Sequence, residues 1–377
     1  MSDSKNGSGS PSQSQFPQLS PAAIQVVDET PFELEYGEVL PRLEICYESW
    51  GELSAERDNA ILLCPSFSGH SHASSHTDDP TPGWWEGLIG PGLAFDTDRN
   101  FVLCPSLLGG ACGTTGPVSI DPSTGLAYGD SFPTISVHDI VNVHVRLLDL
   151  LKIDHLFAVA GGSLGAMQSL ELAMRHPGRV GRVLAFAGTD RTRPYTAGIH
   201  HIGRRAIQLG RRCGDDESID EGLRLAREIG TLFYRSRTEF NQRFSWNPSR
   251  KPDRERSVFE VESYLEHQGY KAVGKFNLDA YLILSMAMDL HDVWKGSPSS
   301  EETLEDVSAE FLNVSAEEDH LIPTDEQLEF HQRLDAAGKR SHWCSLPSIV
   351  GHDSFLVEKE KVSELVEEFF AGSLQAS

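Results

Sequence analysis

The feature that most constrains the fold of this chain is a serine set among glycines between a strand-like and a helix-like segment. Residues 155–161, HLFAVAG, form a nearly continuous apolar run, which is typical of a strand covered on both faces of a sheet. Ser163 follows within GGSLG, and the helical pattern SLGAMQSLELAMRHP ends at a proline. A strand that turns sharply into a helix at G-x-S-x-G is typical of a turn that exposes a nucleophilic serine.

Similar apolar runs, each bounded by turn residues, recur along the chain and alternate with helical patterns. One helical pattern, residues 137–153, places apolar residues at intervals of three and four. Regular alternation of strands and helices predicts an α/β fold built on a mainly parallel sheet. The predicted strands lie at residues 43–51, 59–66, 101–107, 155–161, 180–188, 309–316 and 341–347.

A charged segment with a helical pattern interrupts this alternation between residues 189 and 297. It includes DEGLRLAREIGTLFYRS, and strand patterns resume only after it. A helical insertion of this length within an α/β sheet is typical of a lid domain. We therefore predict a disordered tail rich in Ser, Gln, Gly and Pro at 1–22, a core in two parts at 23–188 and 298–377, and a helical lid at 189–297.

The chain is strongly acidic, with 56 Asp and Glu against 32 Lys and Arg and a net charge of −24. Such a field repels nucleic acid and anionic membranes, so neither is expected as a partner, and a solubilising surface is the simplest explanation of the charge. The six scattered cysteines contain no CxxC pair and indicate neither a disulfide framework nor a zinc site. Without a signal-like N-terminus or a membrane-length apolar run, we expect a soluble cytoplasmic protein.

A serine hydroxyl needs a base to become a nucleophile, and hydrolases with this turn have the order serine, acid, histidine along the chain. His352, in IVGHDSF, follows a strand pattern and is the candidate base. Asp319, in LNVSAEEDHLIP, follows another strand and is the candidate acid, with close competitors at Glu317, Glu318 and Asp325. The order Ser163, Asp319, His352, together with the helical insertion at 189–297, predicts an α/β-hydrolase fold with an inserted helical lid. An inert serine in a tight turn is the alternative.

The loop after the predicted strand at 59–66 carries the other expected parts of the site. An oxyanion hole should combine the backbone N–H of Leu164 with that of Phe67, in CPSFSGHSH. His70, His72 and His76 have a spacing that permits metal binding, but no predicted helix or strand presents them. We attribute them to loop polarity and predict no metal site.

Together these residues resemble the homoserine O-acetyltransferase family, a branch of the α/β-hydrolases that moves an acyl group from acyl-CoA to an amino-acid hydroxyl. The resemblance runs from about residue 30 to residue 370. Besides GGSLGAMQSLE and GHDSF, it rests on GWWEGLIGPGLAFDTDRNFVLC (83–104), LLGGACGTTGPVSIDPSTGLAYGDSFPTISVHD (107–139) and FEVESYLEHQG (259–269). The LGGACGTTGP and FEVESYL segments are specific to the family.

The resemblance implies a role for each of five residues. Ser163 corresponds to the nucleophile, His352 to the base, and Asp319 to the acid in its D-x-L-x-P context, DHLIP. Arg204 and Asp353 correspond to the contacts with the carboxylate and the ammonium of the amino acid. The family further implies acyl-CoA as a co-substrate, no bound cofactor, and a homodimer formed through the lid.

The sequence departs from the family pattern near the expected pockets, at CPSFSGHSH, Leu93, Pro105–Ser106 and Ala166, the last where a second glycine is usual. The expected reaction is acetyl transfer from acetyl-CoA to L-homoserine in methionine biosynthesis. An L-serine O-acyltransferase of cysteine biosynthesis, a homoserine O-succinyltransferase and a plain esterase or thioesterase stay open as alternatives. A candidate site for CoA phosphates or a substrate carboxylate is the lid segment with arginines 191, 193, 204, 205, 211 and 212.

Overall fold

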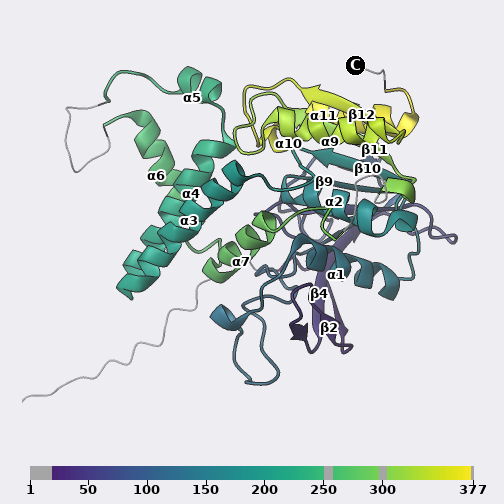
Figure 1. The fold of residues 1–377 in the computed structure, drawn as a ribbon, viewed down its shortest axis with the longest axis horizontal. Coiled ribbons are helices and arrows are strands. Elements are labelled where there is room, and N and C mark those ends of the chain that lie inside the picture. Colours follow the sequence, from purple (N-terminus) through teal and green to yellow (C-terminus); the bar gives the residue numbers. More distant parts are fainter. Residues whose placement is uncertain (1–18, 250–257, 297–303, 375–377) are drawn as a thin grey trace, which may run out of the picture.

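A computed structural model describes residues 19–249, 258–296 and 304–374 (Figure 1). Most of the predicted tail, residues 1–18, therefore lies outside the described residues. An eight-stranded sheet forms the centre of the described chain, in the order β1-β4-β8-β5-β9-β10-β11-β12. Its strands are β1 (Ile24–Asp28), β4 (Leu43–Trp50), β5 (Ala60–Cys64), β8 (Phe101–Pro105), β9 (Ala158–Gly162), β10 (Arg182–Phe186), β11 (Glu310–Ala316) and β12 (Ser341–Leu346).

The sheet is parallel from β8 to β12, whereas β1 and β4 run antiparallel at one edge. Every strand that the sequence predicted is present, so the mainly parallel sheet is confirmed. The edge strand β1 was not predicted, because its short segment IQVVD is mostly exposed and lacks a continuous apolar run. Two short pairs lie outside the main sheet: β2 (Phe32–Glu33) with β3 (Val39–Leu40), and β6 (Ile89–Gly90) with β7 (Phe95–Asp96).

The central strands are buried on both faces, which explains their continuous apolar runs. In β5, Leu62 and Cys64 pack into one core cluster, while Ile61 and Leu63 pack into the cluster on the opposite face. The first cluster includes side chains of α1, α2 and α9, and the second includes side chains of α11. These helices are α1 (Val137–Leu150), α2 (Leu164–Arg175), α9 (Thr324–Ala336) and α11 (Lys359–Ala371), with the short α10 (Ser354–Val357) before α11.

The chain between β10 and β11, predicted as the lid, contains five helices in its described part. Figure 1 shows α3, α4, α5 and α6 standing to one side of the sheet, with α7 between them and the core. The long α3 and α4 pack against each other, and α3 is terminated by Gly214, the residue after its last turn, whose positive φ of 83° suits glycine. The five are α3 (Pro194–Cys213), α4 (Asp216–Tyr234), α5 (Arg237–Arg243), α6 (Glu260–Ala272) and α7 (Leu278–Asp289).

Local signals set the start of several helices. Helix α1 begins after Ser136, whose hydroxyl accepts from the N–H of Asp139 while the Asp139 carboxylate accepts from the Ser136 N–H. Short 3₁₀ turns occur at Gly129–Ser131 and Pro177–Arg179. Among the described residues, no helix has both the length and the apolar character needed to cross a membrane.

Candidate active site

Ser163 lies at the sharp turn between β9 and α2. Its backbone has φ 57° and ψ −121°, which is a strained conformation for a residue with a side chain. The turn places Gly165 so close to β5 that an added Cβ would lie 2.1 Å from the carbonyl oxygen of Cys64. Only glycine fits there, which explains one glycine of the GGSLG motif. Helix α2 begins at Leu164, so the positive end of its dipole lies next to Ser163.

Loops that follow β11 and β12 bring the predicted acid and base to this serine. The Ser163 Oγ lies 2.8 Å from Nε2 of His352, and His352 Nδ1 lies 2.7 Å from Oδ2 of Asp319. All three residues are buried. The structure thus joins the three predicted residues in one hydrogen-bonded chain with the geometry of a Ser-His-Asp triad.

The surroundings of Asp319 distinguish it from the competing carboxylates. Its Oδ1 accepts the backbone N–H groups of Leu321 and Ile322, both at 2.9 Å, so its other oxygen faces His352. Glu317 instead accepts from the Ser345 hydroxyl at the surface. The acid that contacts the histidine is therefore the predicted one, and the two backbone donors hold it in a single orientation.

The charge of Asp319 sets the basicity of His352. Burial by itself lowers the pKa of the imidazole, but the charge and hydrogen bond of Asp319 outweigh burial, with a further contribution from the charge of Asp353. The net result is a pKa of His352 above its usual value. A more basic imidazole accepts the serine proton more readily, and its protonated form is stabilised by the adjacent carboxylate.

The two predicted oxyanion donors lie at the same site. Leu164 is the first residue of α2, and Phe67 lies in the turn after β5 and lines the cavity next to Ser163. Within the described chain, neither of their backbone N–H groups donates a hydrogen bond. Free N–H groups beside a nucleophile are suited to a developing oxyanion.

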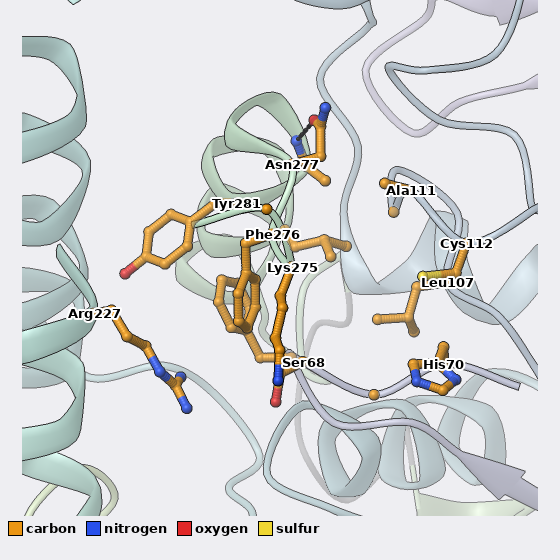
Figure 2. A pocket seen from close by; sticks show the side chains of 16 residues that line it. Ser68, His70, Leu107, Ala111, Cys112, Arg227, Lys275, Phe276, Asn277 and Tyr281 are labelled. Carbon is orange, nitrogen blue, oxygen red and sulfur yellow. Dashed lines mark hydrogen bonds between the residues drawn. The ribbon is translucent and has the colours of Figure 1, made fainter. Parts of the chain in front are cut away.

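Two neighbouring cavities lead to the serine. The smaller, about 90 Å³, is lined by Ser163 and His352, and the larger, about 770 Å³, lies next to it. Both cavities share Phe67, Arg227 and Tyr281 in their walls. Figure 2 shows the larger cavity, with Arg227 and Lys275 on the side of the lid helices and His70, Leu107 and Cys112 facing them.

Arg204, which the family resemblance implied as a substrate contact, has a different place in the structure. It is only 8% exposed, and its guanidinium donates to the Ser285 hydroxyl at 2.7 Å and to Asp289 at 2.5 Å. It is not among the residues that line either cavity. The structure thus places Arg204 outside the cavity lining: its charge is paired with Asp289, and it contacts Ser285, which lines the smaller cavity.

Arg227 on α4 is the cavity residue that the sequence interpretation missed. It lines both cavities, and its guanidinium lies 5.3 Å from the ring centroid of Tyr234 and 5.4 Å from that of Phe276. Within the described residues, no carboxylate forms an ion pair with it. A signal was present in the sequence, because Arg227 lies next to Ala226 and Leu223 in the buried stripe of an amphipathic helix.

Asp353, the other predicted substrate contact, lines the smaller cavity together with Ser163 and Arg227. Its carboxylate lies 3.4 Å from Nε of Arg235, and its side chain is one-quarter exposed. The cavity thus presents a guanidinium and a carboxylate near one hydroxyl nucleophile. These are the groups that would bind the carboxylate and the ammonium of an amino acid.

Of the other arginines in the predicted anion segment, Arg205 and Arg212 are exposed and line neither cavity. Arg191, Arg193 and Arg211 pair with carboxylates, as Arg204 does. Their charge is therefore used within the protein. The cationic side chains that line the larger cavity are instead Arg227 and Lys275.

Comparison with known proteins agrees with this geometry. Residues 59–358 match the family model of the alpha/beta hydrolase fold. The chain is 40% identical over 352 residues to a homoserine O-acetyltransferase of Symbiobacterium thermophilum, an alignment that covers 90% of this chain and 92% of that protein. The chain belongs to the homoserine O-acetyltransferase family.

Two solved structures share the fold of this family member over most of their length. The homoserine O-acetyltransferase from Bacillus anthracis is 27% identical, with a TM-score of 0.86 and coverage of 94% of this chain and 98% of that chain. Esterase E22 is also 27% identical, with a TM-score of 0.84 and coverage of 92% and 99%. The same framework is therefore found in an acyltransferase and in an esterase.

One departure from the homoserine O-acetyltransferase pattern has a structural explanation. Ala166 stands in α2 where a second glycine is usual, and Gly188 lies opposite it after β10. A Cβ added to Gly188 would lie 2.4 Å from the Ala166 Cβ. The small residue needed at this crossing is therefore supplied by Gly188, in the segment after β10, instead of by α2, and the turn at Ser163 is preserved.

Proposed function

We propose that this protein transfers the acetyl group of acetyl-CoA to the hydroxyl of L-homoserine, through an ester on Ser163. The observation that carries the proposal is the chain Ser163–His352–Asp319 at a cavity that also presents Arg227 and Asp353. Membership of the homoserine O-acetyltransferase family supports it. The reaction needs no resident cofactor, and we place the enzyme in the cytoplasm, in methionine biosynthesis.

The first half of the reaction forms the acyl-enzyme. His352 Nε2 takes the proton of the Ser163 hydroxyl as its oxygen attacks the thioester carbonyl carbon. The N–H groups of Leu164 and Phe67 stabilise the oxyanion of the tetrahedral intermediate. The carbon–sulfur bond then breaks, the CoA thiolate receives the proton from His352, and the acetyl group stays on Ser163.

The second half repeats these steps with the amino acid as the nucleophile. The homoserine hydroxyl gives its proton to His352, and its oxygen attacks the ester carbonyl. The bond to Ser163 breaks, and the serine oxygen recovers the proton from His352. The products are O-acetylhomoserine and the free enzyme.

The two cavities suit the two substrates. The cavity beside Ser163 is small and fits a small acyl group, which favours acetyl-CoA over succinyl-CoA as the acyl donor. Arg227 would bind the homoserine carboxylate and Asp353 its ammonium, which places the hydroxyl near the ester. The larger cavity has room for part of CoA, and Lys275 in its wall is a candidate partner for an anionic group of the donor.

Mass spectrometry of the intact protein tests this proposal. Acetyl-CoA alone should add one acetyl group to Ser163, and L-homoserine should remove it much faster than water does. L-serine and succinyl-CoA, offered in separate reactions, test the alternative acceptor and donor. The absence of an adduct, or its loss at one rate with every amino acid and with water, would contradict acyl transfer.

A plain esterase is the second candidate, because the chain resembles esterase E22 as closely in fold as it resembles the acetyltransferase. The same triad serves both reactions, and only the fate of the acyl-enzyme differs. An esterase would form the adduct and lose it to water at a rate that homoserine leaves unchanged. The presence of Arg227 and Asp353 in the wall favours the amino acid.

The raised pKa of His352 predicts the pH dependence of the reaction. The base must be neutral to accept a proton, so activity should be lost as the pH falls through the pKa of the imidazole. Because that pKa lies above its ordinary value of about 6.5, kcat/KM should reach half its maximum above that pH. A pH profile measured at low substrate concentration checks this, and a midpoint well below 6.5 would contradict it.

Replacing Arg227 with methionine should weaken homoserine binding while sparing the first half-reaction. A charge-assisted hydrogen bond contributes about 1.5–3 kcal/mol, so the KM for homoserine should rise roughly 10–100-fold. Release of CoA in the absence of homoserine should change little. Arg224→Met, one turn earlier on α4, removes a cation that pairs with Glu221, packs over Tyr270 and lines neither cavity, and is the matched control. Equal loss in both half-reactions would rule out a specific role in binding the acceptor.

We propose that the enzyme is a homodimer formed through the lid. Tyr195, Ile202 and Leu209 recur every seven residues on α3, and each is more than half exposed. Leu225 and Leu232 repeat this spacing on α4. Such a stripe on paired helices is typical of a helix-packing interface. Light scattering after gel filtration should give twice the chain mass, and Ile202→Glu should give the monomer. A monomeric wild type would contradict the proposal.

A further inference from the structure

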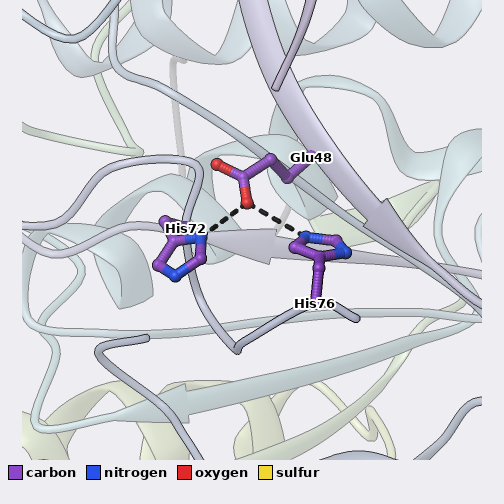
Figure 3. Close-up of side chains that lie close together, drawn as sticks. All are labelled: Glu48, His72 and His76. Carbon is purple, nitrogen blue, oxygen red and sulfur yellow. Dashed lines mark hydrogen bonds and ion pairs between the residues drawn. The ribbon is translucent and has the colours of Figure 1, made fainter. Parts of the chain in front are cut away.

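Three side chains outside the catalytic triad converge on one point beside the larger cavity. Oε2 of Glu48, on β4, lies 2.8 Å from Nδ1 of His72 and 3.0 Å from Nε2 of His76 (Figure 3). Glu48 is fully buried and His72 is 7% exposed. The three ligand atoms all lie within 4.8 Å of one another. The sequence had indicated two of these histidines but not the glutamate, which precedes them by more than twenty residues.

The hydrogen bonds around His72 require a proton or a metal ion at this point. Its Nε2 lies 2.7 Å from the carbonyl oxygen of Thr81, which can only accept, so Nε2 carries a proton. In the neutral ring Nδ1 then has a lone pair, and this lone pair faces the Glu48 carboxylate. A cation, either a proton or a metal ion, must lie between the two groups. His76 Nε2 lies 3.0 Å from the same carboxylate oxygen and can bind the same cation through its lone pair.

The arrangement around the ligands matches what metal sites use. A histidine that binds a metal usually donates its other N–H to a carbonyl or carboxylate, as His72 does to Thr81. Glu48 is likewise held from behind, because its Oε1 accepts from the Ser71 hydroxyl at 2.8 Å. His76 stacks on Trp50, with ring centroids 4.7 Å apart and planes at 15°. All three ligand side chains are thus oriented by neighbours.

Distances and access also suit an ion. Ligand atoms of a tetrahedral zinc with bonds of about 2.1 Å are roughly 3.4 Å apart. The two contacts of Glu48, at 2.8 and 3.0 Å, would need to open by about half an ångström, and all three ligand atoms already lie within 4.8 Å of one another. A cavity of about 370 Å³, lined by Glu48 and His72, provides room for a water molecule as the fourth ligand. Two imidazoles and one carboxylate favour zinc and similar transition metals over magnesium or calcium.

We propose that Glu48, His72 and His76 bind one divalent transition-metal ion, of which zinc is the best match. The ion would link β4 to the loop that follows β5. That loop also carries Phe67, the candidate oxyanion donor, and Ser68 and His70, which line the larger cavity. The role is structural, and the proposal does not depend on acyl transfer.

Metal titration of the full-length protein tests this site. After removal of bound metal with a chelator, ZnCl₂ should bind at one equivalent per chain in a calorimeter and should raise the melting temperature. CoCl₂ should give the intense visible absorption of a four-coordinate ion, without the near-ultraviolet band of a thiolate ligand. That spectrum separates this site from binding by cysteine.

Two variants locate the ion. His76→Ala and Glu48→Gln should each weaken zinc binding by about 100-fold or more, since losing a ligand costs at least as much as losing one of its supporting contacts. His201→Ala, an exposed histidine on α3, should bind as the wild type does. Circular dichroism confirms that each variant is folded. His76, with its side chain 13% exposed, is the milder change of the two. A wild type that binds no zinc, or two folded variants that bind it normally, would overturn the proposal.

Discussion

Replacement of Ser163 by alanine is expected to abolish the acyl adduct and to lower kcat/KM by at least about 10³-fold. The reason is that the hydroxyl forms the covalent bond, and no other group can take its place at the turn. The fold should survive, because alanine adopts the backbone of Ser163 at the same cost and is smaller than serine. Rates measured with acetyl-CoA and homoserine, together with intact-protein mass, check both parts.

Ser66 provides the matched control for this experiment. It lines the same small cavity and carries a hydroxyl, but it is not the hydrogen-bond partner of His352. Ser66→Ala should therefore keep the adduct and most of the activity. If the Ser163 variant still formed an acetyl adduct at the site, or if both variants lost activity equally, the assignment of Ser163 as the nucleophile would be wrong.

Asp319→Asn should lower kcat by about 10⁴-fold, as the corresponding change does in serine proteases, where it imposes the wrong histidine tautomer. The backbone N–H groups of Leu321 and Ile322 both point at Oδ1, so the amide oxygen must occupy that position. The amide NH₂ then faces His352 and donates to Nδ1. The imidazole proton is forced onto Nε2, which faces Ser163 and can no longer accept its proton.

Steady-state rates and one control variant test this orientation effect. Glu317→Gln makes the same chemical change two residues earlier, at a carboxylate that contacts Ser345 and not the histidine. It should retain near-normal activity. The pKa of His352 should also fall in the Asp319 variant, because the charge that raises it is gone. A loss of less than tenfold would show that Asp319 does not set the tautomer.

Much of this molecule was predictable because its signals are local. The strands β5, β9 and β10 are read from short apolar runs, and the turn at Ser163 from glycines that sit beside it in the chain. When a strand is covered on both faces of a sheet, nearly all of its side chains must be apolar, whichever elements cover them. The antiparallel edge strand β1 was missed because one of its faces is exposed and its run is only five residues long.

The substrate contacts were harder to predict from the sequence, because they depend on which charged side chains have no ion-pair partner in the folded protein. Arg204 and Arg227 both lie on lid helices, and both are arginines in amphipathic patterns. Asp289, 85 residues after Arg204, neutralises the charge of Arg204. Arg227 has no such partner among the described residues and faces the cavity. Spacing along the chain contains no information about such a pairing.

The sequence by itself determined the α/β-hydrolase fold and predicted Ser163 and His352 as nucleophile and base, since each is marked by its own turn and strand. Only the tertiary structure separated Asp319 from its neighbours, placed Arg227 and not Arg204 in the cavity wall, and brought Glu48 to the two histidines. The physical reason is the same in all three cases. Hydrogen bonds and ion pairs act over a few ångströms in space, and the residues that make them come from distant parts of the chain.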